Sequence, residues 1–177
     1  MALKSIIYKV SVLLADMDRA YYNNFELTIA RHPSETDQRL ITRILAYILN
    51  ADENLKFGRG LSDEKEAAIW RINYAEEIEL WIELGHPDEK RLKKASHKAK
   101  QLKLYCYHTI TDLWWRQNKQ TLSQFKNLTV EQFNAAQIAE IALKINRNME
   151  FQVSIQDGQC WLTLNDNTQL IEQTTLQ

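Results

Sequence analysis

Hydrophobic and polar residues alternate over the first part of the chain, a pattern typical of strands with one buried face. Between residues 5 and 14, one face would carry Ile6, Tyr8, Val10, Val12 and Leu14. A polar segment follows at residues 16–19, and alternation resumes at residues 25–29. The pattern therefore predicts an N-terminal β-hairpin.

Residues 35–50 have the spacing of an amphipathic helix, with apolar side chains at Leu40, Ile41, Ile44, Leu45 and Ile48. Ser34 is suited to cap its first turn, and Asp37 lies three residues on, as in a capping box. Glu35 and Asp37 would then lie in the first turn, where the helix dipole favours acidic side chains. That structural role is one interpretation of both acids.

The middle of the chain predicts strands at residues 67–72, 78–84 and 102–107. Alternation in the second of these puts one set of side chains on an apolar face, namely Ile78, Leu80, Ile82 and Leu84. Glu79, Trp81 and Glu83 would then share the opposite face. Residues 88–101 predict a helix whose apolar stripe faces the core and whose lysines face outward.

The last third predicts two helices and a second hairpin. Residues 109–119 have helical character, and a capping box at residues 129–132 would start a helix that ends near residue 145. Asp157 and Gly158 favour a type I′ turn, which would put Gln156 opposite Gln159. The last dozen residues are polar and are expected to fray.

The order of elements predicts an α/β fold, a mixed sheet with flanking helices and with N- and C-terminal hairpins, in a single domain over residues 1–177. Apolar residues make up 45% and charged residues 25%, which excludes disordered and fibrous classes. Two cysteines are too few for a disulfide framework. No apolar stretch is long enough to span a membrane, so a cytoplasmic protein with no membrane partner is expected.

Several segments, taken together and in order, resemble the YaeQ family. They include residues 30–36 (Ala-Arg-His-Pro-Ser-Glu-Thr), 80–85 (Leu-Trp-Ile-Glu-Leu-Gly), 87–89 (Pro-Asp-Glu), 114–115 (Trp-Trp) and 155–158 (Ile-Gln-Asp-Gly). The resemblance implies a fold similar to the PD-(D/E)xK nucleases, with a restriction-endonuclease-like core at about residues 34–107. It does not imply a settled activity, because the family is largely uncharacterised.

The nuclease resemblance implies that acids on the central sheet bind Mg²⁺ or Mn²⁺ beside a lysine. The candidate metal ligands are Glu35, Glu79 and Glu83. Glu79 and Glu83 are about 13 Å apart along the strand, which is wide for one ion. Gly85 stands where a nuclease would place its lysine, so a lysine from the next helix, Lys90, Lys93 or Lys94, would have to replace it.

Two classes of function follow from these residues. In the first, the chain is a divalent-metal-dependent nuclease or phosphodiesterase with Glu79, Glu83, Lys93 and Lys94 as catalytic residues and no organic cofactor. In the second, it is a non-catalytic protein that binds a nucleic acid or an unidentified protein. The candidate nucleic-acid contacts are Lys90, Lys94 and His97, which would give a local positive field in a chain of net charge −1.

Both functional interpretations have structural alternatives. Glu79 and Glu83 could line a solvated sheet face, since exposed sheet faces are routinely polar. The lysines could likewise form an ordinary solvated helix face. Convergence of Glu79, Glu83 and a third group in a cleft would favour the enzyme, whereas acids in solvent or in ion pairs would favour a binding protein.

Overall fold

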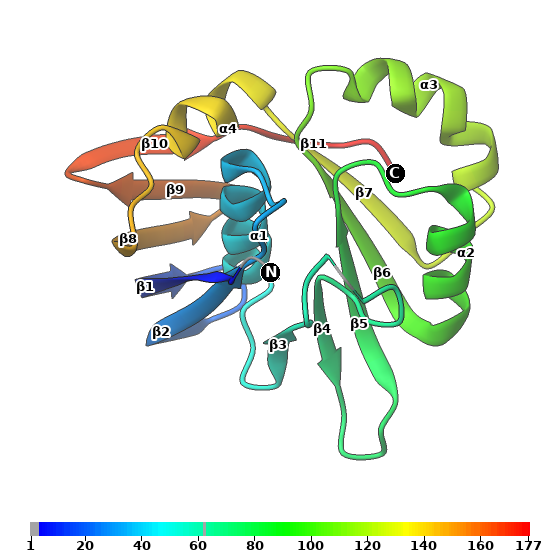
Figure 1. Cartoon of the computed structure of the whole chain (residues 1–177), viewed down its shortest axis with the longest axis horizontal. Helices are drawn as coiled ribbons and strands as arrows, with labels where there is room; N and C mark the ends of the chain where they lie inside the picture. Colours follow the sequence, from blue (N-terminus) through cyan, green and yellow to red (C-terminus); the bar gives the residue numbers. More distant parts are fainter. Residues whose placement is uncertain (1–3, 62) are drawn as a thin grey trace.

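The computed structural model describes residues 4–61 and 63–177, which form two mixed sheets and four helices (Figure 1). The five-stranded sheet has the order β10-β9-β8-β1-β2. Its strands are β1 (Ile6–Asp16), β2 (Tyr21–Arg31), β8 (Asn148–Gln156), β9 (Gln159–Leu164) and β10 (Asn167–Ile171). β1 and β8 run parallel and the other neighbours antiparallel, so both predicted hairpins belong to this sheet.

The six-stranded sheet has the order β11-β7-β6-β5-β4-β3. Its strands are β3 (Leu55–Phe57), β4 (Ile69–Ile72), β5 (Ile78–Leu84), β6 (Ala99–Cys106), β7 (Leu128–Phe133) and β11 (Gln173–Thr175). β5, β6 and β7 are parallel, and helices α2 (Glu89–Lys98) and α3 (Thr111–Leu122) make the crossovers between them.

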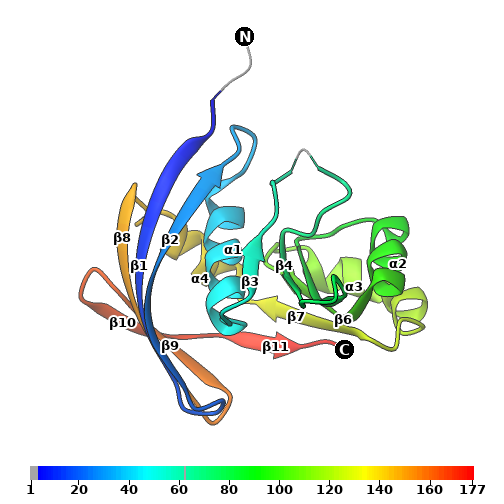
Figure 2. The ribbon, with the colours of Figure 1, turned by 90° about the horizontal axis from the view of Figure 1, so that it is seen from below.

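The two sheets face each other across a buried helix, α1 (Asp37–Leu49), as Figure 2 shows. Apolar side chains from both sheets, from α1 and from α4 (Ala135–Ala142) form one core. A second core lies on the far side of the six-stranded sheet, where α2 packs with Leu92 and Ala95 against Trp81. The molecule is therefore layered as sheet, helix, sheet and helix.

The C-terminal hairpin confirms its prediction. Asp157 and Gly158 both have positive φ, 53° and 73°, as a type I′ turn requires. Gln156 pairs with Gln159, and the side chains that alternate inward are buried, namely Phe151, Val153, Ile155, Cys160 and Leu162. The first hairpin, the helix after it and the strand at 78–84 are confirmed as well.

Three sequence predictions are wrong. There are two sheets where one was predicted, because α1 needs an apolar surface on more than one side. Residues 128–133 form β7 rather than a helix start, since parallel pairing with β6 outweighs the local capping signal, and Asn134 caps α4 instead. The last dozen residues are not frayed, because β10 and β11 each join one of the two sheets.

The start of α1 also differs from its prediction. Thr36, not Ser34, is the N-cap, and its side chain accepts from the backbone N–H of Arg39 at 3.2 Å. Glu35 therefore precedes the helix. The strands that a restriction-endonuclease-like core requires do share the six-stranded sheet, but the nuclease likeness itself stays a prediction. No helix in the two described ranges is long and apolar enough to cross a membrane.

Candidate functional site

A cleft of about 330 Å³ brings together residues from α1, β5, α2 and the loops between them. It lies where β5 and β6 end, the usual position of ligand sites in sheets with parallel strands. The polar side chains that line it are Arg39, Glu64, Glu83, His86, Arg91, Tyr107 and His108. Of the residues that the sequence proposed for a site, only Glu83 lines this cleft directly.

Glu83 is buried and committed to two donors. Its side chain is 5% exposed, the indole Nε1 of Trp81 donates to its Oε1 at 2.6 Å, and Arg91 Nη2 lies 2.8 Å from the same oxygen. Arg91 also donates to the backbone oxygens of Glu64 and Glu66. Glu83 therefore orients Arg91, and Arg91 in turn connects the loop before β4 to the start of α2.

Glu35 holds two arginines of α1. Its side chain is 1% exposed, with Arg39 Nη1 at 2.7 Å from one carboxylate oxygen and Arg43 Nη2 at 2.7 Å from the other. Burial lowers the pKa of Arg43, and the charge of Glu35 opposes that shift. Arg39 makes one side-chain hydrogen bond to Glu35 and lines the cleft, so its other donors are available to a ligand there.

The prediction that Glu79 shares a face with Glu83 is wrong. The pairing register of β4 and β5 shifts between Arg71 and Ile72. Leu80 pairs with Arg71 and Ile78 pairs with Ile72. Glu79 lies between Ile78 and Leu80 and therefore has no partner residue in β4. Glu79 pairs with Arg71 at 3.2 Å, and Arg71 also pairs at 3.3 Å with Asp52, which follows α1. A β-bulge breaks the alternation on which the prediction relied, and it takes Glu79 away from the cleft.

The prediction that Lys93 or Lys94 lies near Glu79 or Glu83 is also wrong. Leu92 and Ala95 are the buried residues of α2, so Lys93 and Lys94 fall on its exposed side. Arg91, next to Leu92, takes the position beside Glu83 that was assigned to a lysine. Lys90 and His97 are exposed on the same helix. The proposed metal and catalytic roles of these residues stay predictions.

Sequence reasoning missed the histidines of the cleft. His86 stacks on Trp114 with ring centroids 4.6 Å apart and contacts His108 at 4.8 Å. Burial, with a smaller effect of His108, lowers the pKa of His86 to about 4. The glycine before His86 was the local sign of a close approach at this point. Gly85 has a φ of 82°, and a side chain there would place its Cβ 3.4 Å from His108 Nε2.

The cleft combines arginines held by buried carboxylates with two histidines whose pKa values are lowered by burial. Glu35 and Glu83 are the buried acids at the cleft, and each carboxylate already binds a guanidinium, whereas Glu64 in its lining is exposed. Within residues 4–61 and 63–177, no three His, Cys, Asp or Glu side chains are grouped so as to hold a metal ion. A divalent ion would have to displace an arginine in order to bind Glu35 or Glu83.

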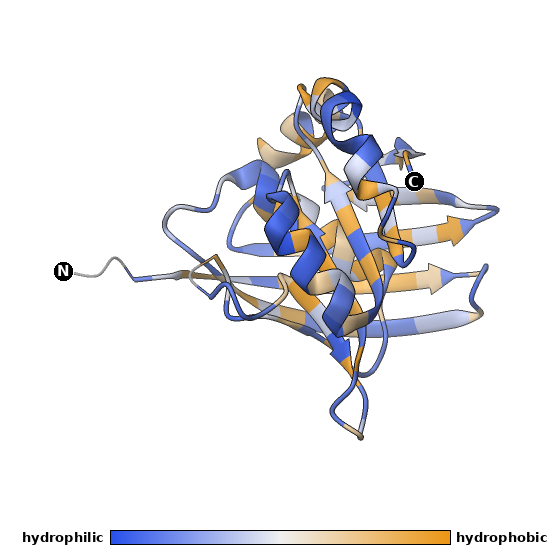
Figure 3. Ribbon diagram, turned by 90° about the vertical axis from the view of Figure 1, so that its right-hand side faces the viewer, coloured by the Kyte–Doolittle hydropathy of each residue, from blue (hydrophilic) through white to orange (hydrophobic). Residues whose placement is uncertain are grey.

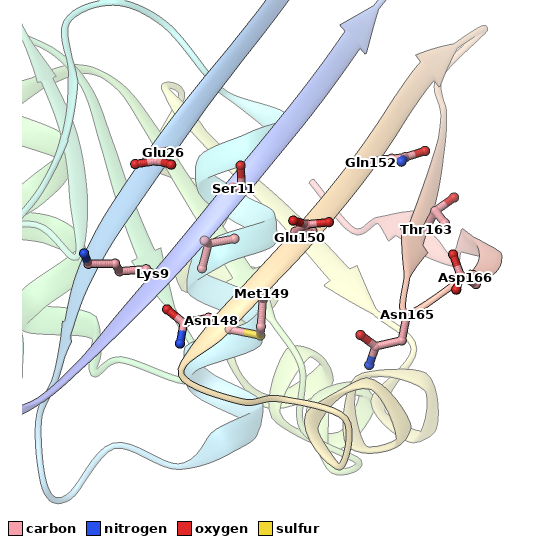
Figure 4. A pocket seen from close by; sticks show the side chains of 11 residues that line it. Lys9, Ser11, Glu26, Asn148, Met149, Glu150, Gln152, Thr163, Asn165 and Asp166 are labelled. Atoms are coloured by element: carbon pink, nitrogen blue, oxygen red, sulfur yellow. The ribbon is translucent and has the colours of Figure 1, made fainter.

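Another hollow, of about 540 Å³, lies on the outer face of the five-stranded sheet. Its polar side chains, among them Lys9, Glu26, Glu150 and Asp166, project from neighbouring strands and spread along the sheet (Figure 4). They do not converge on one point, unlike the side chains of the cleft. The cleft is therefore the better candidate for a site built by the fold.

The profile of a family described as YaeQ protein matches residues 1–173. The chain belongs to the YaeQ family. It is 44% identical to an uncharacterized YaeQ protein of Salmonella typhi and 43% identical to that of Escherichia coli strain K12, over 100% of this chain and 98% of each relative.

Two solved structures of YaeQ proteins have the same fold. The protein from Xanthomonas axonopodis pv. citri superposes with a TM-score of 0.93 at 36% identity, covering 98% of both chains. The protein from Pseudomonas syringae gives 0.94 at 32% identity, covering 98% of this chain and 96% of the other. The two-sheet arrangement is thus shared with both of these YaeQ proteins.

Glu35→Gln is expected to lower the free energy of unfolding by about 3 kcal/mol, because it leaves Arg43 buried without a counter-charge. Glu79→Gln is the matched control, since Glu79 is 36% exposed and its pair with Arg71 should contribute less than about 1 kcal/mol. Urea unfolding of both variants measures the difference. Equal effects would show that Glu35 is not the structural centre of the cleft.

Acid is expected to destabilise the protein between pH 6.5 and about 4 through His86. The pKa of His86 is lower in the folded protein, so the unfolded chain binds the proton first and stability falls as the pH drops through this window. The loss should be about 1–2 kcal/mol after allowing for solvent screening of a half-buried ring. Unfolding of wild type and His86→Gln at both ends of the window measures it, and an unchanged pH dependence in the variant would refute the assignment.

Proposed function

We propose that this YaeQ protein binds a nucleic acid through the exposed basic face of α2 and does not cleave it. The basic face comprises Lys90, Lys93, Lys94, His97 and Lys98, all of them exposed. The observation that carries the proposal is that one helix presents four exposed lysines. In the two described ranges, none of them forms an ion pair with a carboxylate.

Unpaired lysines favour phosphate contacts because their charge is not already neutralised. Lys100, just beyond the same helix, shows the contrast: its Nζ lies 2.6 Å from Glu77. Each lysine that contacts a phosphate releases a bound counterion from the nucleic acid, which favours association at low salt. A chain of net charge −1 can attract a polyanion only through such a local patch.

The fold supports a fixed orientation of the basic face. Asp88 caps α2 by accepting from the backbone N–H of Arg91 at 2.7 Å, and Leu92 and Ala95 are fully buried against the second core. Residues three and four apart share a helix face, so Lys90, Lys94 and Lys98 follow one line on its surface. Figure 3 turns this side of the molecule toward the viewer, and hydrophilic helical surface is prominent on it.

Binding without cleavage is favoured by how the acids are used. Glu83 is occupied by Arg91 and Trp81, Glu79 lies at a β-bulge, and among the described residues no lysine forms an ion pair with either acid. A nuclease of the expected kind needs carboxylate oxygens free to bind a metal and a cation placed to activate water. In this protein the acids hold arginines instead.

Metal-dependent phosphodiester cleavage on a restriction-endonuclease-like fold is the second candidate. The observation in its favour is that Glu83 and Arg39, the partner of Glu35, line one cleft. Mg²⁺ or Mn²⁺ would bind there if it displaced Arg39 and Arg91 from the two carboxylates, and the freed arginines could then contact phosphate. This candidate requires cleavage activity that depends on Glu83.

Replacing Lys90, Lys94 and Lys98 with Gln is expected to weaken binding of a labelled 20-base-pair DNA duplex by about tenfold or more at low salt, because three phosphate contacts are lost. Fluorescence anisotropy measures the affinity. The control replaces Lys56, Lys119 and Lys126, which are exposed elsewhere, and should change the affinity by less than about twofold.

Two outcomes would contradict the proposal. Equal losses in both triple variants would show that binding, if any, is spread over the surface rather than placed on α2. Cleavage of the duplex in Mg²⁺ or Mn²⁺ that Glu83→Gln abolishes, in protein that still melts cooperatively, would establish the second candidate in its place.

A further inference from the structure

A separate pocket of about 460 Å³ lies at the seam between the two sheets. It is bounded by β6 and β7, by the β8–β9 hairpin and by the C-terminal segment that passes from one sheet to the other. It shares no lining residue with the cleft described above. Apolar side chains such as Leu49, Ile155 and Leu170 line it beside Lys103 and Tyr105.

Lys103 is the unusual residue of this seam pocket. It is half-buried, and its Nζ donates to Asn50 Oδ1 at 2.7 Å. No carboxylate within the described ranges forms an ion pair with it. Lys100, three residues earlier, is exposed and paired with Glu77. Lys103 therefore has the setting of a functional amine rather than that of a surface charge.

Asn50 holds the amine in place. Its Nδ2 donates to the backbone oxygen of Ala46 at 2.8 Å and to Tyr105 Oη at 2.7 Å, so its Oδ1 is fixed toward Lys103. This arrangement leaves two N–H groups of the ammonium, or one N–H group and the lone pair of the deprotonated amine, for a molecule in the pocket. An amide anchor orients the amine without adding the negative charge that would favour the ammonium form.

Burial of Lys103 also favours the neutral amine. Burial lowers the pKa of Lys103, Glu131 opposes the shift, and Arg19 and Arg71 add to it. Both oxygens of Glu131 lie 3.0 Å from the hydroxyl of Thr175, which holds that acid. Glu172 and the Cys160 thiol also line the pocket. A desolvated lysine near other cations is a known way to make a nucleophilic amine.

Tyr105 supplies a proton donor beside the amine. Burial raises the pKa of Tyr105, so its hydroxyl stays protonated. The oxygen accepts from Asn50, and its own hydrogen has no acceptor among the described residues. That hydrogen can be donated to an oxygen atom in the pocket. A nucleophilic amine and a hydroxyl donor on the same strand face are the pair that a carbonyl group requires.

We propose that the seam pocket binds a small, partly apolar aldehyde or ketone and that Lys103 forms a reversible imine with it. The neutral Nζ adds to the carbonyl carbon, and Tyr105 gives its proton to the carbonyl oxygen and regains the one that Nζ loses, which leaves a neutral carbinolamine. Loss of one water then gives the imine, so amine and carbonyl become imine and water with no oxidant or reductant. This site is independent of the basic face of α2.

Benzaldehyde with sodium cyanoborohydride tests the proposal, because the reagent reduces the imine to a stable benzyl-lysine that peptide mass spectrometry locates. Lys103 is expected to react at least about threefold faster than the more exposed Lys100 at pH 8. Its rate should saturate as benzaldehyde is raised, since binding precedes reaction. The rate at Lys100 should rise in proportion to concentration.

Tyr105→Phe is the matched variant, because Asn50 keeps its bond to Ala46 and Lys103 is retained. Reaction at Lys103 should slow while that at Lys100 stays unchanged, and the melting temperature reports whether the fold is kept. A rate at Lys103 that is no higher than at Lys100, or that does not saturate, would overturn the proposal whether or not the variant folds, because wild type alone decides it.

Discussion

The burial of α1 between two sheets is the constraint on which the rest of the structure depends. Six of its apolar residues, Leu40, Ile41, Ile44, Leu45, Ala46 and Ile48, are at most 1% exposed. A helix buried this completely needs an apolar surface on both sides, so the chain builds one sheet from its two ends and another from its middle. The C-terminal segment joins both sheets, because β10 pairs in the first and β11 in the second.

This burial decides how the polar residues of α1 are used. Arg43 is 3% exposed on the helix, and an isolated buried guanidinium is strongly unfavourable, so Glu35 is held beside it. The same carboxylate orients Arg39 toward the cleft. At the other end of α1, Asn50 is fixed to Ala46 and reaches Lys103 in the seam pocket. Both pockets thus depend on polar groups at the two ends of one buried helix.

The sequence predicted the elements whose signals are local and whose faces are simple. The Asp157-Gly158 turn and the alternation around it predicted a pairing register for β8 and β9, because a slip by one residue would expose Phe151 and Val153. The structure confirms that register. The family was predicted on dispersed segments and confirmed. The division into two sheets was not predicted, because strand pairing between distant segments, such as β1 with β8, leaves no local trace.

The candidate site was predicted less well, for two physical reasons. A β-bulge at Glu79 reverses the face of a strand, and nothing in the alternation of residues 78–84 announces it. Arg91 was not predicted as the partner of Glu83, because it is one of several basic residues in the same segment. Its planar guanidinium nevertheless suits a buried carboxylate better than an ammonium group does. The cleft histidines and Arg39 come from three separate segments that only the tertiary fold brings together.

Electrostatic binding by the basic face of α2, rather than metal chemistry at the cleft, is the central functional claim for this YaeQ protein. The salt dependence of duplex DNA binding by the wild-type protein tests it most directly. If the four lysines of α2 contact phosphates, the logarithm of the association constant should fall linearly with the logarithm of salt concentration, with a slope of about −3 to −4. A slope near zero, or no binding at low salt, would contradict it.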